Sequence, residues 1–230
     1  MKKSKIISLA LTLSLGLSSL ALAADSNKEP ASLDADTVEY DMRTGEITAT
    51  DNVLMKRGEA KVAGQKAAYN LNTMDGYVEG NVIAVRGDIR MTCAKLVSDK
   101  AEHMQALGGV HATQLDREFT GEQVDYYPKQ NDYVRIENGG VARSKDGIFK
   151  ADFMEGWLKD EHYVGVGNAY VNSPTKDLEA GGDRIDYYGK EEEGKAIMTG
   201  HAWAIQDNNT LHGNRLVLYL AKDGSANVQQ

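Results

Sequence analysis

The stretch that decides the fold is residues 35–55, ADTVEYDMRTGEITATDNVLM. It holds two short segments in which apolar and polar residues alternate, and Arg43-Thr44-Gly45 separates them with turn-forming residues. The apolar residues of the second segment share one parity: Ile47, Ala49, Val53 and Met55. Residues of one parity lie on one face of a strand, so the stretch predicts a hairpin with one apolar face.

The same pattern recurs along the chain every 28 to 31 residues. Its first anchor is a small residue followed three positions later by an apolar one, and the copies start at Ala35, Gly64, Cys93, Gly121, Ala151, Gly182 and Gly213. A second anchor is a Gly or Asn step before Val or Ala, as in Asn52-Val53 and Gly80-Asn81-Val82. Six full copies and a seventh half-copy predict an all-β chain of about thirteen or more strands.

The repeated glycine step predicts a corner or bulge at which each strand bends. In the fourth copy Ile136 lies one position further back, which indicates a local bulge at Asn138-Gly139. A unit of two strands cannot bury its apolar face alone, so successive units must stack. We therefore expect a single domain over 35–220, built as an open, folded stack of antiparallel strand pairs.

The N-terminal residues are typical of an export signal. Lys2, Lys3 and Lys5 precede an apolar run over 6–22, and Ala21-Leu22-Ala23 has the small residues that signal peptidase requires. We expect a signal peptide over 1–23, cleavage after Ala23, a flexible segment over 24–34 and a flexible tail over 221–230. The alternative is an uncleaved membrane anchor, because the run approaches the length that spans a bilayer.

The charge balance excludes some partners. Loss of the three leader lysines takes the formal charge from −8 to −11. An acidic chain repels phosphate backbones and anionic membrane surfaces, so we expect no nucleic-acid partner. Cys93 is the single cysteine, which rules out an intrachain disulfide, and its anchor position favours a packed structural thiol.

No pattern in the sequence indicates catalysis. The histidines are scattered without metal-ligand spacing: His103, His111, His162, His201 and His212. Glu191-Glu192-Glu193 is typical of a solvated charge run, and the repeated glycines precede strands, unlike phosphate-binding loops. The sequence thus predicts a protein that is not an enzyme, with no catalytic residues, no metal and no cofactor.

Two stretches carry a family resemblance. Residues 35–41 and 45–53 resemble the opening repeat of the OstA-like, or LptA, family of lipopolysaccharide transport proteins, and Glu79-Gly80-Asn81-Val82 resembles the next repeat. The resemblance extends as a repeat pattern from about Ala35 to Leu220. Asp51 departs from it, because the family usually has glycine there, yet Asp tolerates unusual backbone angles and the corner should persist.

The resemblance implies a V-shaped β-jelly-roll whose groove holds the acyl chains of lipid A. It also implies a periplasmic protein whose copies stack head to tail as a bridge between the inner and outer membranes. Its partners would be lipopolysaccharide, other copies of itself, and the inner-membrane and outer-membrane proteins of the same pathway. Two alternatives stay open: a membrane-anchored inner-membrane partner of that pathway, and a β-solenoid surface or scaffold protein that binds no lipid.

The apolar face supplies candidate groove residues, many of them small enough to leave room between two sheet faces. They are Val38, Ile47, Ala49, Val53, Met55, Val78, Val82, Ala84, Val110, Ala112, Val124, Ile136, Met154, Ile185, Met198 and Leu216. An open stack also leaves an unpaired strand at each end, which invites strand addition. The candidate edge residues are Thr37, Val38, Glu39, Tyr40, Leu216, Val217, Leu218, Tyr219 and Leu220.

Overall fold

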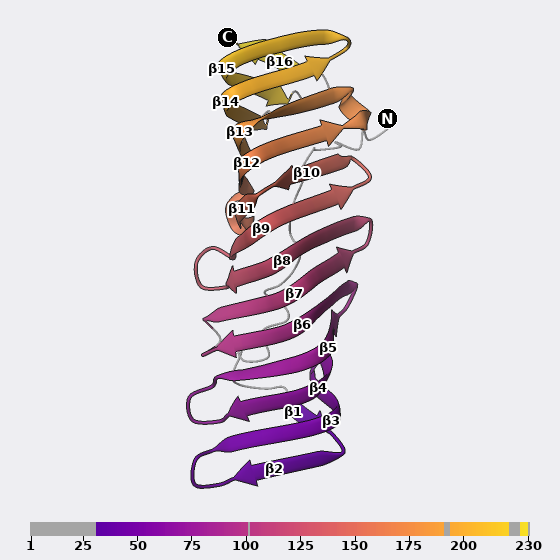
Figure 1. Ribbon diagram of the computed structural model, residues 1–230, viewed down its shortest axis with the longest axis vertical. Coiled ribbons are helices and arrows are strands. Elements are labelled where there is room, and N and C mark those ends of the chain that lie inside the picture. The colour runs from indigo at the N-terminus through magenta and orange to yellow at the C-terminus, as the bar shows by residue number, and fades with distance from the viewer. Residues whose placement is uncertain (1–30, 101, 191–193, 221–225, 230) are drawn as a thin grey trace, which may run out of the picture. The chain divides into compact units, whose positions relative to one another are not determined.

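The computed structural model describes residues 31–100, 102–190, 194–220 and 226–229. These ranges contain sixteen strands and two 3₁₀ turns, η2 (Leu158–Asp160) and η3 (Pro174–Lys176), and no α-helix (Figure 1). The all-β prediction is confirmed. Nothing helical in the described ranges is long and apolar enough to cross a membrane. The predicted signal peptide and its cleavage after Ala23 fall outside these ranges and stay predictions.

The chain divides into two compact units between Asn138 and Gly139, a point that lies within strand β9 (Tyr133–Ser144). The N-terminal unit is an antiparallel sheet in the order β1-β3-β4-β5-β6-β7-β8, with β2 also paired to β3. Its strands are β1 (Ala31–Asp34), β2 (Thr37–Asp41), β3 (Glu46–Arg57), β4 (Ala60–Asn70), β5 (Gly76–Arg86), β6 (Ile89–Asp99), β7 (His103–Gln114) and β8 (Arg117–Tyr127). Short turns join neighbouring strands, as the hairpin repeat predicts.

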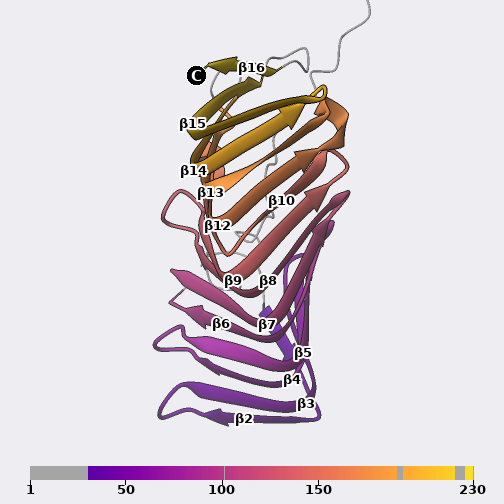
Figure 2. The same ribbon diagram turned by 45° about the horizontal axis from the view of Figure 1, so that its top comes forward.

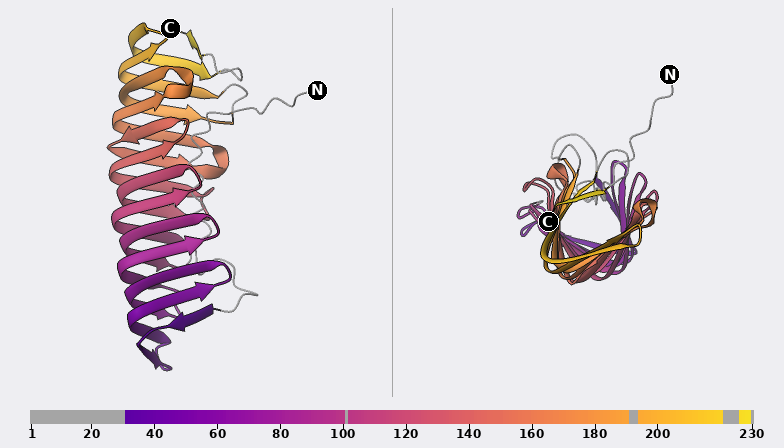
Figure 3. Two further views of the ribbon diagram at one scale, coloured as in Figure 1. Left: turned by 90° about the vertical axis from the view of Figure 1, so that its right-hand side faces the viewer. Right: turned by 90° about the horizontal axis from the view of Figure 1, so that it is seen from above.

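The C-terminal unit continues the same hairpin plan. The last residues of β9 pair with β10, and the order then runs β10-β12-β13-β14-β15-β16 with β11 paired to β12. The strands are β10 (Gly147–Ala151), β11 (Phe153–Trp157), β12 (His162–Ser173), β13 (Leu178–Tyr188), β14 (Lys195–Gln206), β15 (Asn209–Leu220) and β16 (Ala226–Gln229). Within each unit, consecutive strands lie side by side (Figure 3), except that β1 and β2 both pair with β3, and β10 and β11 both pair with β12.

The strands β3, β5, β7, β9, β12 and β14 each bend at two consecutive residues with left-handed backbone angles. In β3 these residues are Asp51 (φ 62°) and Asn52 (φ 53°), and in β5 they are Gly80 (φ 87°) and Asn81 (φ 50°). The register of the pairing shifts at the same points, which marks a bulge that turns the strand (Figure 2). The predicted corners are confirmed, and Asp51 keeps its corner without glycine.

Small polar residues serve the corners because left-handed angles are costly for most side chains. Asn52 Nδ2 donates to Asp36 Oδ2 at 2.8 Å, and Asn168 Nδ2 donates to Asp152 Oδ2 at 2.7 Å. At the last corner His201 Nδ1 lies 3.0 Å from Asp183 Oδ2. The corner residues Asn52, Asn168 and His201 thus each pair with the carboxylate of an aspartate.

Sixteen strands exceed the thirteen that the repeat predicts for three identifiable reasons. One repeat strand is interrupted at Asp152, whose N–H donates to Gly167 O, and it therefore appears as β10 and β11. The other two strands belong to terminal segments. The expected flexible segment over 24–34 contains β1, and the expected flexible tail over 221–230 contains β16.

Candidate functional site

The N-terminal unit has an apolar cavity of about 280 Å³. Ile47 and Met55 line it from opposite sides of the corner in β3, so the cavity lies between the two arms of the bent strands. Val78, Leu96 and Met104 extend the lining over β5, β6 and β7. Because the lining is mainly hydrocarbon, the cavity suits an apolar ligand.

Four residues that are paired across neighbouring strands line one part of the cavity. Gly76 pairs with Tyr69 on one side and with Ser98 on the other, and Ser98 pairs with Met104. All four residues line the cavity. The ring of Tyr69 lies over Gly76, because a Cβ atom added at Gly76 would come within 2.7 Å of the ring carbon Cδ2.

The ends of the two arms form the mouth of this cavity. Lys56 and Arg57 line it at the end of β3, and Lys56 Nζ lies 3.4 Å from Asp34 Oδ2. Leu71, in the turn after β4, lines the opposite side and is 49% exposed. One side of the mouth thus carries charged groups, among them the Lys56–Asp34 ion pair, and the other side is apolar.

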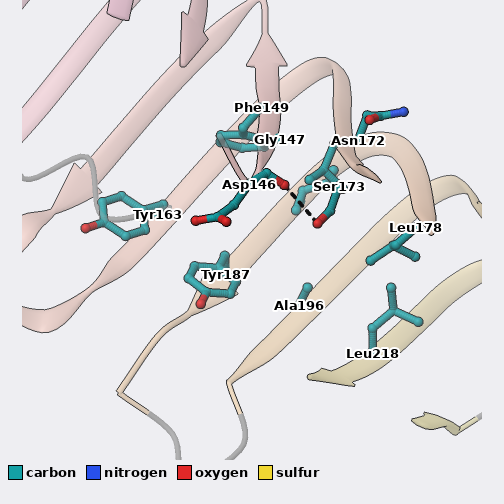
Figure 4. A pocket seen from close by; sticks show the side chains of 12 residues that line it. Asp146, Gly147, Phe149, Tyr163, Asn172, Ser173, Leu178, Tyr187, Ala196 and Leu218 are labelled. Atoms are coloured by element: carbon teal, nitrogen blue, oxygen red, sulfur yellow. Dashed lines mark hydrogen bonds between the residues drawn. The ribbon is translucent and has the colours of Figure 1, made fainter. Parts of the chain in front are cut away.

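The C-terminal unit has a smaller cavity, of about 40 Å³, because aromatic rings fill its interior (Figure 4). Phe149 lies on one side of the bend, and Tyr163 and Tyr187 lie on the other with their ring centroids 6.2 Å apart. Burial raises the pKa of Tyr187 to about 12, and the charge of Glu161 adds to the effect. The ionised form of Tyr187 is therefore absent at neutral pH.

Most of the predicted groove residues lie on the inner face. The buried ones are Ala49, Val53, Val78, Val82, Ala84, Val110, Ala112, Val124, Ile136, Met154, Ile185, Met198 and Leu216. Ile47 and Met55 are half-buried and line the large cavity, together with Val78. Val38 is 48% exposed, because β2 has a neighbour on one side only. The binding of lipid by these residues stays a prediction.

Several lining residues were missed by the sequence reasoning. Leu96 and Ser98 belong to the first anchor of the repeat, and Tyr69 occupies the same anchor one copy earlier. The anchor periodicity could have found these three. Leu33 lies in β1, outside the repeat, and nothing in the pattern points to it.

Four histidines, His103, His111, His162 and His201, each lie within 4 Å of one carboxylate. His103 Nε2 lies 2.7 Å from Oδ1 of the buried Asp125, which also accepts hydrogen bonds from Gln105 and Gln123. Within the described ranges, no three residues among His, Cys, Asp and Glu are grouped so as to hold a metal ion. That the protein is not an enzyme stays a prediction.

Cys93 is predicted to resist alkylation in the folded protein. Its thiol is buried, which raises the pKa to about 11, and Sγ lies 3.4 Å from Lys95 O. Only the thiolate reacts, so at pH 8 iodoacetamide should label the native chain about 100-fold or more slowly than the urea-unfolded chain. Mass spectrometry of timed samples measures both rates, and labelling should accelerate only as the pH approaches 11. Equal rates in the two states would contradict the buried position.

The two ends of the repeat differ in how they are covered. At β2, Val38 and Tyr40 are each 48% exposed, and the adjoining Met42 is 82% exposed. At the other end, β16 pairs with Val217–Leu220 of β15. The expectation of an open edge over Leu216–Leu220 therefore needs correction. The backbone groups of Val217–Leu220 are hydrogen-bonded to β16 of the same chain. Residues 209–216 have no strand on that side among the described residues.

Comparison with known proteins places the chain beside one transport family. The model of a family described as LptA/(LptD N-terminal domain) LPS transport protein matches residues 32–224. Among solved structures, the chain is similar to the crystal structure of LptH, the LptA homologous periplasmic component of the conserved lipopolysaccharide transport device from Pseudomonas aeruginosa. That likeness has a TM-score of 0.42 and 16% identity, and it covers 47% of this chain and 82% of the other. No curated protein matches the sequence.

Proposed function

This chain belongs to the LptA/LptD N-terminal domain family of lipopolysaccharide transport proteins, and we propose that it is a periplasmic carrier of lipopolysaccharide. In this proposal the acyl chains of the lipid enter the cavity between the arms of the N-terminal unit. The observation that carries the proposal is the cavity of about 280 Å³ lined by Ile47, Met55, Val78, Leu96 and Met104. No catalytic step is part of the proposed function.

The energetics of such a site favour capture by hydrocarbon burial. Each methylene transferred from water contributes about 0.8 kcal/mol, so ten carbons contribute roughly 8 kcal/mol before the costs of ordering the chain. The formal charge of −8 opposes adhesion of an anionic head group to the protein surface at large. The head group accordingly stays in solvent at the mouth, beside Lys56 and Arg57.

Mass spectrometry of the protein purified from the periplasm tests this function. We expect an acylated glycolipid to co-purify and to be released in proportion to the protein, and the same spectrum reports the processed N-terminus. A chain starting at Ala24 or Asp25 would agree with cleavage, whereas an intact leader would favour the membrane-anchored alternative. A protein free of acylated lipid, both as purified and after exposure to lipopolysaccharide vesicles, would contradict the carrier function.

We further propose that copies associate head to tail through the two ends of the repeat. The exposed β2 edge of one copy would pair with the open part of β15, over 209–216, in the next. Exposed apolar residues on β2 support this role, because an undefended apolar edge favours strand addition. Such a stack would connect to the inner-membrane and outer-membrane proteins of the pathway.

Lysine at both Val38 and Tyr40 is predicted to weaken this self-association at least tenfold. The change removes two exposed apolar side chains from the edge and adds charges that repel an incoming strand. Sedimentation velocity over a range of concentrations should show association for the wild type and a monomer for the double variant. Leu115→Lys is the matched control, because Leu115 is an 83% exposed apolar residue in a turn away from both edges. A wild type that stays monomeric at all concentrations would refute the stacking proposal.

A further inference from the structure

Two neighbouring turns of the N-terminal unit carry exposed apolar side chains. Met42, between β2 and β3, is 82% exposed, and Leu71 and Met74, between β4 and β5, are 49% and 36% exposed. Figure 1 shows these turns one above the other at the same side of the unit. Single exposed apolar residues are common on protein surfaces, whereas a group of them marks a surface that contacts a partner.

Hydrogen bonds hold the two turns together. Leu71 N donates to Gly45 O at 2.9 Å, and Asn72 Nδ2 donates to Thr44 O at 2.8 Å. The backbone of one turn thus fixes the position of the other, and the apolar side chains belong to a single ordered surface. We call this surface the apolar lip, and it consists of Met42, Leu71 and Met74.

The apolar lip adjoins the mouth of the large cavity. Leu71 belongs to both, because it lines the cavity and is also half-exposed to solvent. Tyr69, two residues earlier in the chain, and its partner Ile47 on β3 line the cavity further in. Hydrocarbon therefore extends from the lip into the cavity, so that an acyl chain moving between them stays out of water.

Strand addition at β2 does not account for this surface. Leu71 and Met74 follow β4, which has β3 on one side and β5 on the other and lies two strands from the edge. Neighbouring strands are about 4.8 Å apart, so a second copy paired to β2 would reach Met42 but not the other two residues. A partner that covers all three must contact the tips of the turns.

The charges beside the lip favour an electrically neutral partner. Residues 42–45 contain Arg43 and no carboxylate. The flanking carboxylates are engaged, since Asp41 Oδ2 lies 3.1 Å from the Arg43 guanidinium and Asp75 Oδ1 accepts a hydrogen bond from Lys100 N at 3.2 Å. The chain as a whole has a formal charge of −8, which repels anionic lipids. Zwitterionic lipids, whose head groups carry no net charge, are therefore the matching membrane surface.

We propose that the apolar lip binds the surface of a zwitterionic lipid bilayer, with its three side chains among the acyl chains below the head groups. Turn tips suit this contact because their side chains project beyond the ends of the strands, and the unbranched side chain of methionine adapts to a disordered surrounding. The contact brings the cavity mouth to the hydrocarbon of the membrane. The inference goes beyond the proposed carrier function, because binding to a bilayer does not require a filled cavity.

Flotation of the full-length processed protein with vesicles of pure phosphatidylcholine tests the proposal. The wild type should float with the vesicles, and Met42→Ser/Met74→Ser should have a partition coefficient about fivefold lower or less, because a smaller apolar surface leaves water on binding. Neither methionine lines the cavity, so the double variant should capture lipopolysaccharide as the wild type does. Replacing half of the phosphatidylcholine by phosphatidylglycerol should weaken wild-type binding, since the acidic chain then faces an anionic surface.

Leu115→Ser is the matched control. Leu115 is 83% exposed in the turn between β7 and β8, and this variant should bind the vesicles as the wild type does. A wild type that stays at the bottom of the gradient, or equal partition of the double variant and the wild type, would overturn the membrane contact and leave the carrier function standing. A double variant that loses self-association, while the wild type does not bind vesicles, would assign the lip to a second copy and likewise overturn the proposal.

Discussion

Glutamate at Ile47 is expected to lower the affinity for lipopolysaccharide more than 100-fold while the fold is kept. Ile47 lines the cavity of the N-terminal unit and is only half-buried, so a carboxylate there can reach water in the free protein. A bound acyl chain would cover that carboxylate. Burying an unpaired charge against hydrocarbon costs several kcal/mol, and about 3 kcal/mol already corresponds to a 100-fold loss of affinity.

Thr50→Glu is the control for this experiment. Thr50 lies in the same strand on the opposite face, next to Lys66 of β4, so the new charge is solvated and has a cationic neighbour. Crosslinking to lipopolysaccharide and circular dichroism are measured for both variants and for the wild type. We expect wild-type crosslinking in Thr50→Glu and wild-type spectra in both. Undiminished crosslinking in Ile47→Glu would remove this cavity from the proposed function.

Alanine at Gly147 is expected to destabilise the protein by about 3 kcal/mol or more. Gly147 begins β10 with a φ of +151°, and a Cβ atom placed there would meet the backbone oxygen of Asn172. Backbone cannot move aside as a flexible side chain can, and Asn172 is held in place by its pairing with Ile148. The cost of the positive φ, about 1–2 kcal/mol, adds to an overpacking cost of about 1–3 kcal/mol.

Gly87→Ala separates the backbone clash from the conformational effect. Gly87 has a φ of +56°, and a Cβ atom there would meet nothing within 4 Å. Its replacement should therefore cost only about 1 kcal/mol. Urea denaturation measures both variants against the wild type. Comparable losses in the two variants would mean that Gly147 is not packed against Asn172 as described.

The fold could be predicted to a large extent because each repeat contains residues that mark where its strand bends. A corner needs two residues with left-handed angles, and Gly, Asn and Asp are the residues that adopt them at low cost. The pairs Gly80-Asn81 and Gly167-Asn168 meet this requirement, and all four residues have a positive φ in the structure. Alternation of apolar residues around such steps then assigns the inner face, which is why Val53, Val82 and Ala169 are buried.

The ends of the chain could not be predicted in the same way. Residues 31–34 and 226–229 show no repeat anchor, yet they form β1 and β16. Each pairs with only part of its neighbour: β1 with Leu54–Arg57, and β16 with Val217–Leu220. Short strands of this kind depend on the hydrogen-bonding groups that the adjoining strand leaves open, and that is a property of the assembled sheet.

By itself the sequence determined the all-β class, the period of the hairpins, the corners and the membership of the inner face, because backbone angles and side-chain alternation are local properties. Only the tertiary structure decided where that face is open. The cavity is lined by Ile47 of β3, Val78 of β5 and Met104 of β7, which lie far apart in the chain but in one sheet. Volume left between side chains is a sum over neighbours from several strands, so no single stretch of sequence contains it.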